Sequence, residues 1–143
     1  MKLLSWLCAA LLAFVLPVVC QADAAEAKQI GLELNDLQPA ESGCLAVFVV
    51  HNGLGDPLDK LSLRVVAFDA EQHAKLFLSL DVGALPVDKT RVLRFDLGSS
   101  LKCSDVGRLV LDDVIACEGA KMDPQKCLMA LALSSRAAVP IDF

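Results

Sequence analysis

The chain has 143 residues, of which 55% are hydrophobic, and a net charge of −5. This length suits one domain with a substantial hydrophobic core. The basic residues are scattered, so the sequence has no basic stripe of the kind that binds nucleic acid. Tyrosine is absent and the single tryptophan, Trp6, lies near the start, which argues against the exposed aromatic platforms of sugar-binding proteins.

The first 24 residues have the three parts of a secretory signal peptide. Lys2 supplies a positive charge, residues 3–19 are almost entirely apolar, and Ala22-Asp23-Ala24 is a small-residue cleavage pattern. We therefore expect residues 1–24 to be removed on export. Residues 25–143 would then form a single domain without a membrane span.

Two alternatives to cleavage after residue 24 are open. The apolar run could be a transmembrane anchor, but it is slightly shorter than the roughly 20 residues that a span requires. Cys20 could be acylated as in a lipoprotein, although Val19 is larger than the residue that usually precedes such a cysteine. Both alternatives predict a different mature mass.

Seven segments of the mature chain show a strand pattern. Most alternate apolar and polar residues, and residues 44–51 form a continuous apolar run typical of a central strand. In chain order the predicted strands are 30–35, 44–51, 61–68, 75–80, 93–97, 109–115 and 127–133. Turn clusters separate them, and Ser104-Asp105 and Asp123-Pro124 offer N-cap residues for short helical turns.

Strands of this number and spacing predict an immunoglobulin-like antiparallel β-sandwich. The four mature cysteines, Cys44, Cys103, Cys117 and Cys127, would form two disulfides in an oxidising compartment. Three pairings are open. Cys44–Cys103 with Cys117–Cys127 fits the sandwich best, because each pair then lies at one end of it. The second pair would close a hairpin between the last two strands.

Two stretches resemble known families. Residues 51–71, ending in Phe68-Asp69, together with 83–90, look like part of the bacterial extracellular sandwich domains of the FxLYD type. The whole mature chain also resembles a family of small, uncharacterised periplasmic proteins of Gram-negative bacteria. Gly43-Cys44, residues 101–108 and residues 112–114 carry that likeness. The resemblance implies a fold and a compartment, and it implies no chemistry.

The sequence offers little for catalysis or metal binding. Its two histidines, His51 and His73, fall at a strand end and in a loop, and neither has a recognisable nucleophile beside it in sequence. A weak calcium site is an alternative to solvated acids at Asp105, Asp112, Asp113 and Glu118. Arg108 is expected to pair with Asp105 or Asp112. We therefore expect no enzyme activity and no cofactor or metal.

The most suggestive stretch is the loop 118–126, which a Cys117–Cys127 disulfide would hold in place. It presents Lys121, Met122, Asp123 and Lys126, with Met122 as an adaptable anchor at an exposed tip. The turn at 52–56 is expected at the opposite end of the sandwich. The alternative interpretation is that the disulfide only stabilises a hairpin and that the loop has no binding role.

Three functions follow by elimination. The first is a non-catalytic periplasmic interaction module that acts through an unidentified protein partner, for example in an envelope assembly. The second is an inhibitor that uses the stapled loop against a periplasmic enzyme. The third is an enzyme or calcium-binding protein that uses the acidic residues.

Overall fold

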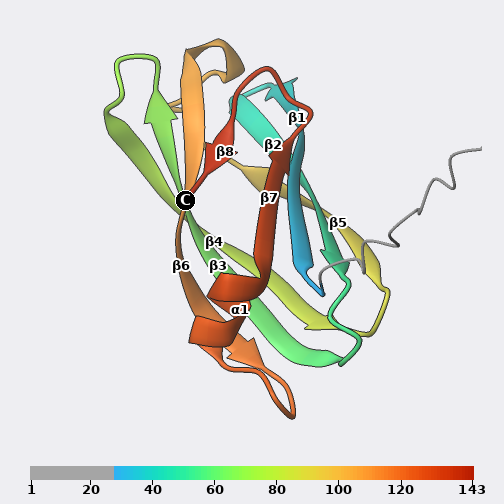
Figure 1. Ribbon diagram of the computed structural model, residues 1–143. Coiled ribbons are helices and arrows are strands. Elements are labelled where there is room, and N and C mark those ends of the chain that lie inside the picture. Colours follow the sequence, from blue (N-terminus) through green and yellow to red (C-terminus); the bar gives the residue numbers. More distant parts are fainter. Residues whose placement is uncertain (1–27) are drawn as a thin grey trace, which may run out of the picture.

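The computed structural model describes residues 28–143, which form a sandwich of two four-stranded β-sheets (Figure 1). The first sheet, in the order β5-β2-β1-β7, contains β5 (Thr90–Asp96), β2 (Gly43–Asn52), β1 (Ile30–Ala40) and β7 (Leu131–Ser135). The second, in the order β4-β3-β6-β8, contains β4 (Ala74–Leu85), β3 (Leu58–Asp69), β6 (Val106–Glu118) and β8 (Ile141–Asp142). The expected all-β sandwich is confirmed. The predicted signal peptide and Cys20 lie outside the described residues.

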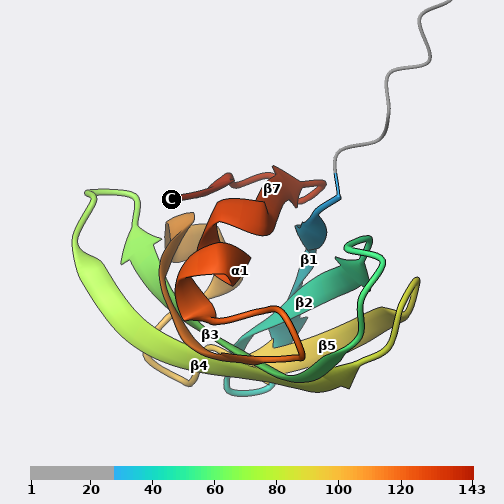
Figure 2. The same cartoon turned by 60° about the horizontal axis from the view of Figure 1, so that its bottom comes forward.

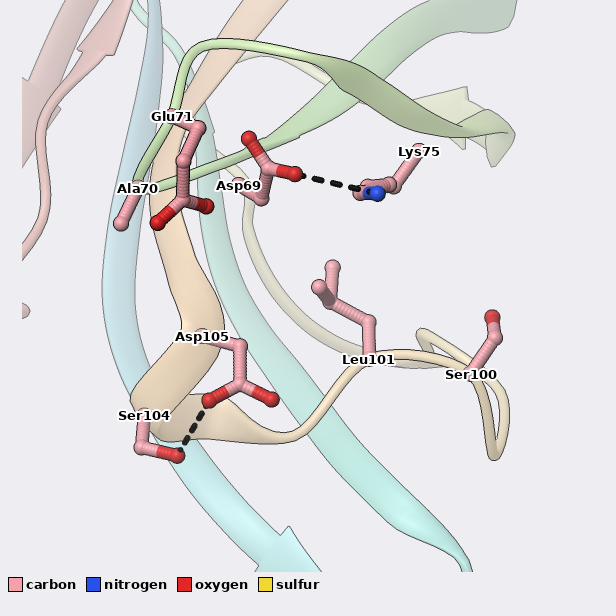
Figure 3. Close-up of a pocket in the computed structure, with 8 residues that line it drawn as sticks. All are labelled: Asp69, Ala70, Glu71, Lys75, Ser100, Leu101, Ser104 and Asp105. Carbon is pink, nitrogen blue, oxygen red and sulfur yellow. Dashed lines mark hydrogen bonds and ion pairs between the residues drawn. The ribbon is translucent and has the colours of Figure 1, made fainter.

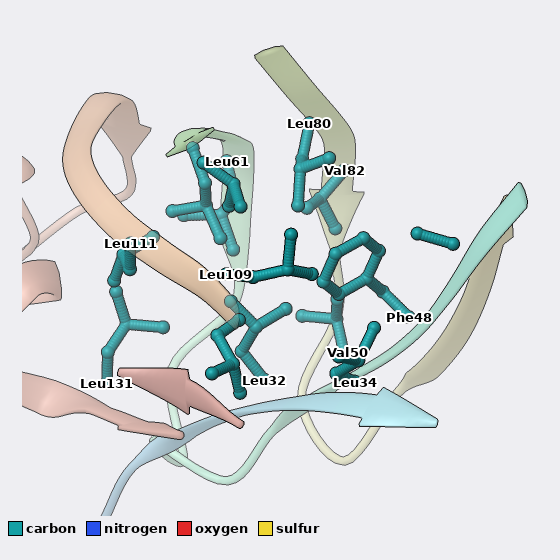
Figure 4. Close-up of a cluster of buried hydrophobic side chains, with 14 of the residues drawn as sticks. Leu32, Leu34, Phe48, Val50, Leu61, Leu80, Val82, Leu109, Leu111 and Leu131 are labelled. Atoms are coloured by element: carbon teal, nitrogen blue, oxygen red, sulfur yellow. The ribbon is translucent and has the colours of Figure 1, made fainter. Parts of the chain in front are cut away.

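The core lies between the two sheets and is built from inward-facing aliphatic residues of both. Figure 4 shows Leu32, Leu34, Phe48 and Val50 of the first sheet facing residues of the second. The facing residues, all buried, include Leu61, Leu80, Val82, Leu109 and Leu111. Phe48 also meets the Phe95 ring edge-on, with ring centroids 6.0 Å apart. Side chains that alternate along each strand therefore close the sandwich.

Both expected disulfides are present. Cys44, at the start of β2, bonds to Cys103 of the short 3₁₀ helix η1 (Cys103–Asp105), which directly precedes β6. Cys117, near the end of β6, bonds to Cys127. The first bridge joins the two sheets at one end of the sandwich and the second closes a short loop at the other.

The prediction of a strand over residues 127–133 is wrong in its first half. Residues Pro124–Ala130 form the helix α1, and the strand β7 begins only at Leu131. Asp123 is the N-cap, proline occupies the first turn, and the following residues are good helix formers. Local preference for a helix therefore exceeds the strand tendency of the apolar run.

The expected hairpin between the last two long strands is also absent from residues 28–143. Helix α1 carries the chain across to the first sheet, where β7 runs parallel to β1. Only the two residues of β8 return to β6, again in parallel. Figure 2 shows α1 and β7 lying across the open side between the sheets. Among the described residues, no helix has both the length and the apolar character needed to cross a membrane.

Candidate functional site

The predicted loop is held at the end of β6 by a covalent bond and a helix cap. A single bridge pairs Gly119 with Met122, and α1 starts two residues later. The Asp123 carboxylate accepts a hydrogen bond from the Lys126 backbone N–H at 3.0 Å. This bond, together with the Lys126 ammonium, lowers the pKa of Asp123. The Cys117–Cys127 bond fixes α1 to β6 from the other side.

The lysines of this loop make contacts within the molecule. Lys126 Nζ lies 3.1 Å from the Asp123 carboxylate and donates to the Lys121 carbonyl at 3.2 Å. Lys121 Nζ lies 3.3 Å from Asp56 Oδ1. Both lysine side chains are still more than half exposed, at 75% for Lys121 and 56% for Lys126. They therefore remain accessible to an acidic partner.

Two expectations about this loop are wrong. Met122 is half-buried and packs against the hydrophobic core, because its backbone bridge to Gly119 turns it inward and away from an exposed tip. The turn at 52–56 lies at the same end of the sandwich, since Asp56 pairs with Lys121. A Cβ placed on Gly119 would lie 2.9 Å from the Pro57 carbonyl oxygen, so the two loops touch.

Helix α1 supplies two exposed apolar side chains at this end. Met129 is 73% exposed and Leu128 is 36% exposed, although both follow the buried Cys127. We call the surface made by Lys121, Lys126, Leu128 and Met129 the stapled end. The sequence did not reveal the two apolar members, because an assumed strand across 127–133 gave no reason for both to face solvent. The Asp123-Pro124 cap signal was the available clue.

A cleft of about 380 Å³ lies at the other end of the sandwich (Figure 3). It is lined by Asp69, Ala70, Glu71, Lys75, Ser100, Leu101, Ser104 and Asp105. Asp69 is its most enclosed ionisable group, with a side chain only 9% exposed. The His73 backbone N–H donates to Asp69 at 2.8 Å and Lys75 Nζ lies 3.1 Å away. These contacts lower the pKa of the Asp69 carboxyl.

The ionised Asp69 side chain is expected to stabilise the fold in a pH-dependent way. Because its pKa is lowered in the folded state, its contribution is complete above the unfolded value of 3.8 and is lost as the pH falls through the lower folded pKa. We expect Asp69→Asn to be less stable than the wild type at neutral pH, and the difference to shrink below a pH of about 4. Urea unfolding across pH measures this difference.

The control for this experiment is Asp59→Asn, because Asp59 is exposed at the start of β3. It should change the free energy of unfolding by less than about 0.5 kcal/mol at either pH. If the difference in the free energy of unfolding between wild type and Asp69→Asn stays constant down to strongly acid pH, the role assigned to the Asp69 charge is contradicted.

The histidines lie apart from each other and each has a simple partner. His51 Nδ1 lies 3.0 Å from Thr90 Oγ1 on the exposed face of the first sheet. His73 is 72% exposed and lies 3.5 Å from the Asp69 carboxylate. Asp69 thus lies at Nδ1 of His73, where the orienting acid of a catalytic triad lies. Within residues 28–143, neither histidine forms a hydrogen bond through Nε2, where the nucleophile of a triad would lie.

Arg108 does not make the ion pair that was expected. Its guanidinium carbon lies 4.8 Å from the centroid of the Phe68 ring, in a cation–π contact across the outer face of the second sheet. Asp112 pairs instead with Arg64, at 3.4 Å. Arg108 and Asp112 are four positions apart on the same extended strand β6, which separates them by about 13 Å and prevents the expected pair.

The acidic residues considered for calcium are held separately. Asp113 lies 3.9 Å from Arg64, Glu118 lies 3.8 Å from Lys60, and Asp105 accepts from Ser104 Oγ at 2.8 Å. Within the described part of the chain, no three His, Cys, Asp or Glu side chains gather as a metal-binding group. Asp112 and Asp113 therefore share Arg64, while Asp105 and Glu118 make separate surface contacts.

Comparison of the chain with protein-family models, with curated proteins and with solved structures gives no match in any of the three. The resemblance to a periplasmic family stays a prediction from the sequence.

Proposed function

We propose that this protein is a non-catalytic interaction module of the periplasm and that its stapled end binds a protein partner. The observation that carries the proposal is the exposure of Met129, at 73%, on a helix that a disulfide and an N-cap hold in place. Since the helix is already ordered, binding costs little conformational entropy. The flexible methionine side chain adapts to an apolar pocket.

The charges around Met129 suggest the chemistry of the partner. Lys121 and Lys126 project at this end of a chain whose net charge is −5. A partner that offers an apolar pocket with an acidic rim would complement both features. The signal-like N-terminus and the two disulfides support the periplasm as the place of binding.

The test is capture from periplasmic extract by the immobilised mature protein. We expect the double variant Leu128→Ser/Met129→Ser to recover at least tenfold less of a specific partner, because truncation of a central hot spot costs about 2 kcal/mol or more. Its urea unfolding midpoint should stay close to that of the wild type, since both side chains are exposed. Met122 is left unchanged because it packs against the core.

The matched control is Val92→Ser on β5, where the valine is 65% exposed on the first sheet. It should leave partner recovery unchanged. If this control abolishes capture while Leu128→Ser/Met129→Ser does not, the binding surface lies elsewhere. Turnover of a substrate by the purified protein would exclude the non-catalytic assignment altogether.

A further inference from the structure

The two disulfides differ in how far they are buried. In the second bridge, Cys117 is 3% exposed and Cys127 is 0% exposed, so neither residue is accessible. In the first bridge, Cys44 is also fully buried, but Cys103 is half-buried. Among residues 28–143, Cys103 is therefore the only cysteine that is not buried.

Cys103 also borders a second cleft, which has a volume of about 380 Å³. We call it the cysteine cleft. It lies between the end of β1 and the residues around η1, and it shares Ser104 with the cleft around Asp69. Its lining includes Pro39, Ala40, Glu41, Lys102 and Cys103. The volume falls within the roughly 300–1,000 Å³ of small-molecule sites, so a small thiol fits beside Cys103.

Two opposite charges stand at the cysteine cleft. Lys102, next to Cys103, and Glu41 both line it and are both exposed. Neither forms an ion pair with another of the described residues. The attacking species in thiol–disulfide exchange is a thiolate anion. The Lys102 ammonium therefore attracts it to the cleft, and the Glu41 carboxylate repels it.

We propose that Cys103 is a thiol-exchange site, at which a small dithiol opens the Cys44–Cys103 bridge of the folded protein while Cys117–Cys127 stays closed. One thiolate of the dithiol bonds to Cys103 Sγ and breaks its bond to Cys44 Sγ, which leaves as a thiolate and takes up a proton. The second thiolate of the reagent then displaces Cys103 Sγ, which is protonated in turn. The dithiol is oxidised to a cyclic disulfide, and two electrons and two protons pass to the two cysteines.

Opening of this bridge leaves the opposite end of the molecule unchanged. The Leu97 N–H donates to the Cys44 carbonyl at 2.8 Å, and this bond does not require the disulfide. Helix α1 stays attached to β6 through Cys117–Cys127. The exchange site is therefore independent of partner binding by Met129, which is measured without reductant.

The test is timed reduction of the folded mature protein by dithiothreitol. Samples are quenched with acid, denatured, alkylated and mapped by mass spectrometry. Cys44 and Cys103 should become alkylated at an initial rate at least about tenfold higher than that of Cys117 and Cys127. In concentrated urea, where burial no longer distinguishes the bridges, the two rates should agree to within about threefold.

Filling the cysteine cleft tests whether the thiol enters there. Ala40→Phe places a ring in this cleft and should slow opening of Cys44–Cys103 by about fivefold or more, because exchange depends on access to the attacked sulfur. The matched control is Ala70→Phe in the neighbouring cleft, which should leave the rate unchanged. Thermal unfolding checks that both variants fold.

Two charge variants at exposed positions keep the test valid if Ala40→Phe does not fold. At low ionic strength Lys102→Gln should slow opening of Cys44–Cys103, and Glu41→Gln should speed it, each by about two- to fivefold. Four results overturn the proposal: equal rates for the two bridges in the folded protein, earlier opening of Cys117–Cys127, a preference that persists in urea, or charge variants that shift the rate in the opposite directions.

Discussion

Removal of the Cys44–Cys103 disulfide is expected to lower the free energy of unfolding by about 4 kcal/mol. The bridge closes a loop between residues 59 positions apart in sequence and joins the start of β2 to η1. Without it, the unfolded chain gains the entropy of a loop that contains most of β2 and all of β3, β4 and β5. Urea unfolding of Cys44→Ala/Cys103→Ala against wild type measures the loss. Alanine is chosen because Cys44 is fully buried and a hydroxyl there would need a partner.

The second disulfide provides the matched comparison. Cys117 and Cys127 are only 10 positions apart, so the same entropy argument gives somewhat less than 3 kcal/mol. Cys117→Ala/Cys127→Ala should therefore remain more stable than Cys44→Ala/Cys103→Ala by about 1–1.5 kcal/mol. Equal losses, or the reverse order, would show that release of the longer loop does not dominate the effect.

The sheets could be predicted from the sequence because their signal is local. Strand patterns such as 44–51 depend on alternation and on β-branched residues, which report burial directly. The best-fitting of the three cysteine pairings followed from the same strands, since Cys44 begins one predicted strand and Cys103 lies just before another, both at one end of a sandwich. Both inferences needed only the direction of each strand and its neighbours in the sheet.

The stapled end could not be predicted because it depends on a competition between a helix and a strand. Residues 127–133 are apolar enough for either, and the N-cap at Asp123 with the following proline decides for the helix up to Ala130. Once α1 forms, the chain emerges beside β1, so β7 joins the first sheet. One local choice thus changes the strand order and exposes Met129.

The position of the turn at 52–56 beside the loop 118–126 could not be predicted either. Its residues identified a turn, but a turn signal does not say which other loop lies beside it. The Lys121–Asp56 pair and the close approach of Gly119 to Pro57 come from tertiary packing.

The largest single-residue effect is expected at Asn52, which is fully buried at the end of β2. Its side-chain Nδ2 donates to the Leu85 carbonyl at 2.9 Å and to the Asp56 carbonyl at 3.0 Å. Its Oδ1 accepts from the Leu54 backbone N–H at 3.0 Å. One amide therefore joins the turn after β2 to the end of β4, across the two sheets.

The backbone N–H and carbonyl of Asn52 also both form hydrogen bonds. Its N–H donates to the Lys89 carbonyl at 3.1 Å, and its own carbonyl accepts from the Asp88 N–H at 2.9 Å. The loop between β4 and β5 is thereby fixed to the same residue. Asn52 thus supports two loops at once, while the sequence marked it only as the first residue of a turn cluster.

Asn52→Leu should lower the free energy of unfolding by about 3–5 kcal/mol. Leucine has the same branched shape and is no smaller than asparagine, so the loss does not come from a cavity. It comes from the Leu54 N–H and the Leu85 and Asp56 carbonyls, each of which loses a partner where water cannot readily replace it. The effect is measured by urea unfolding with both disulfides intact.

Asn52→Asp separates the donor role from the acceptor role. Aspartate still accepts from the Leu54 N–H but offers no donor to the two carbonyls and brings a charge into a buried site. It should therefore be at least as destabilising as Asn52→Leu at neutral pH. His51→Ala, at the exposed neighbouring position, should cost less than about 1 kcal/mol. If Asn52→Asp is as stable as the wild type, the two donated bonds do not hold the loops together, and packing around Leu54 and Leu85 does.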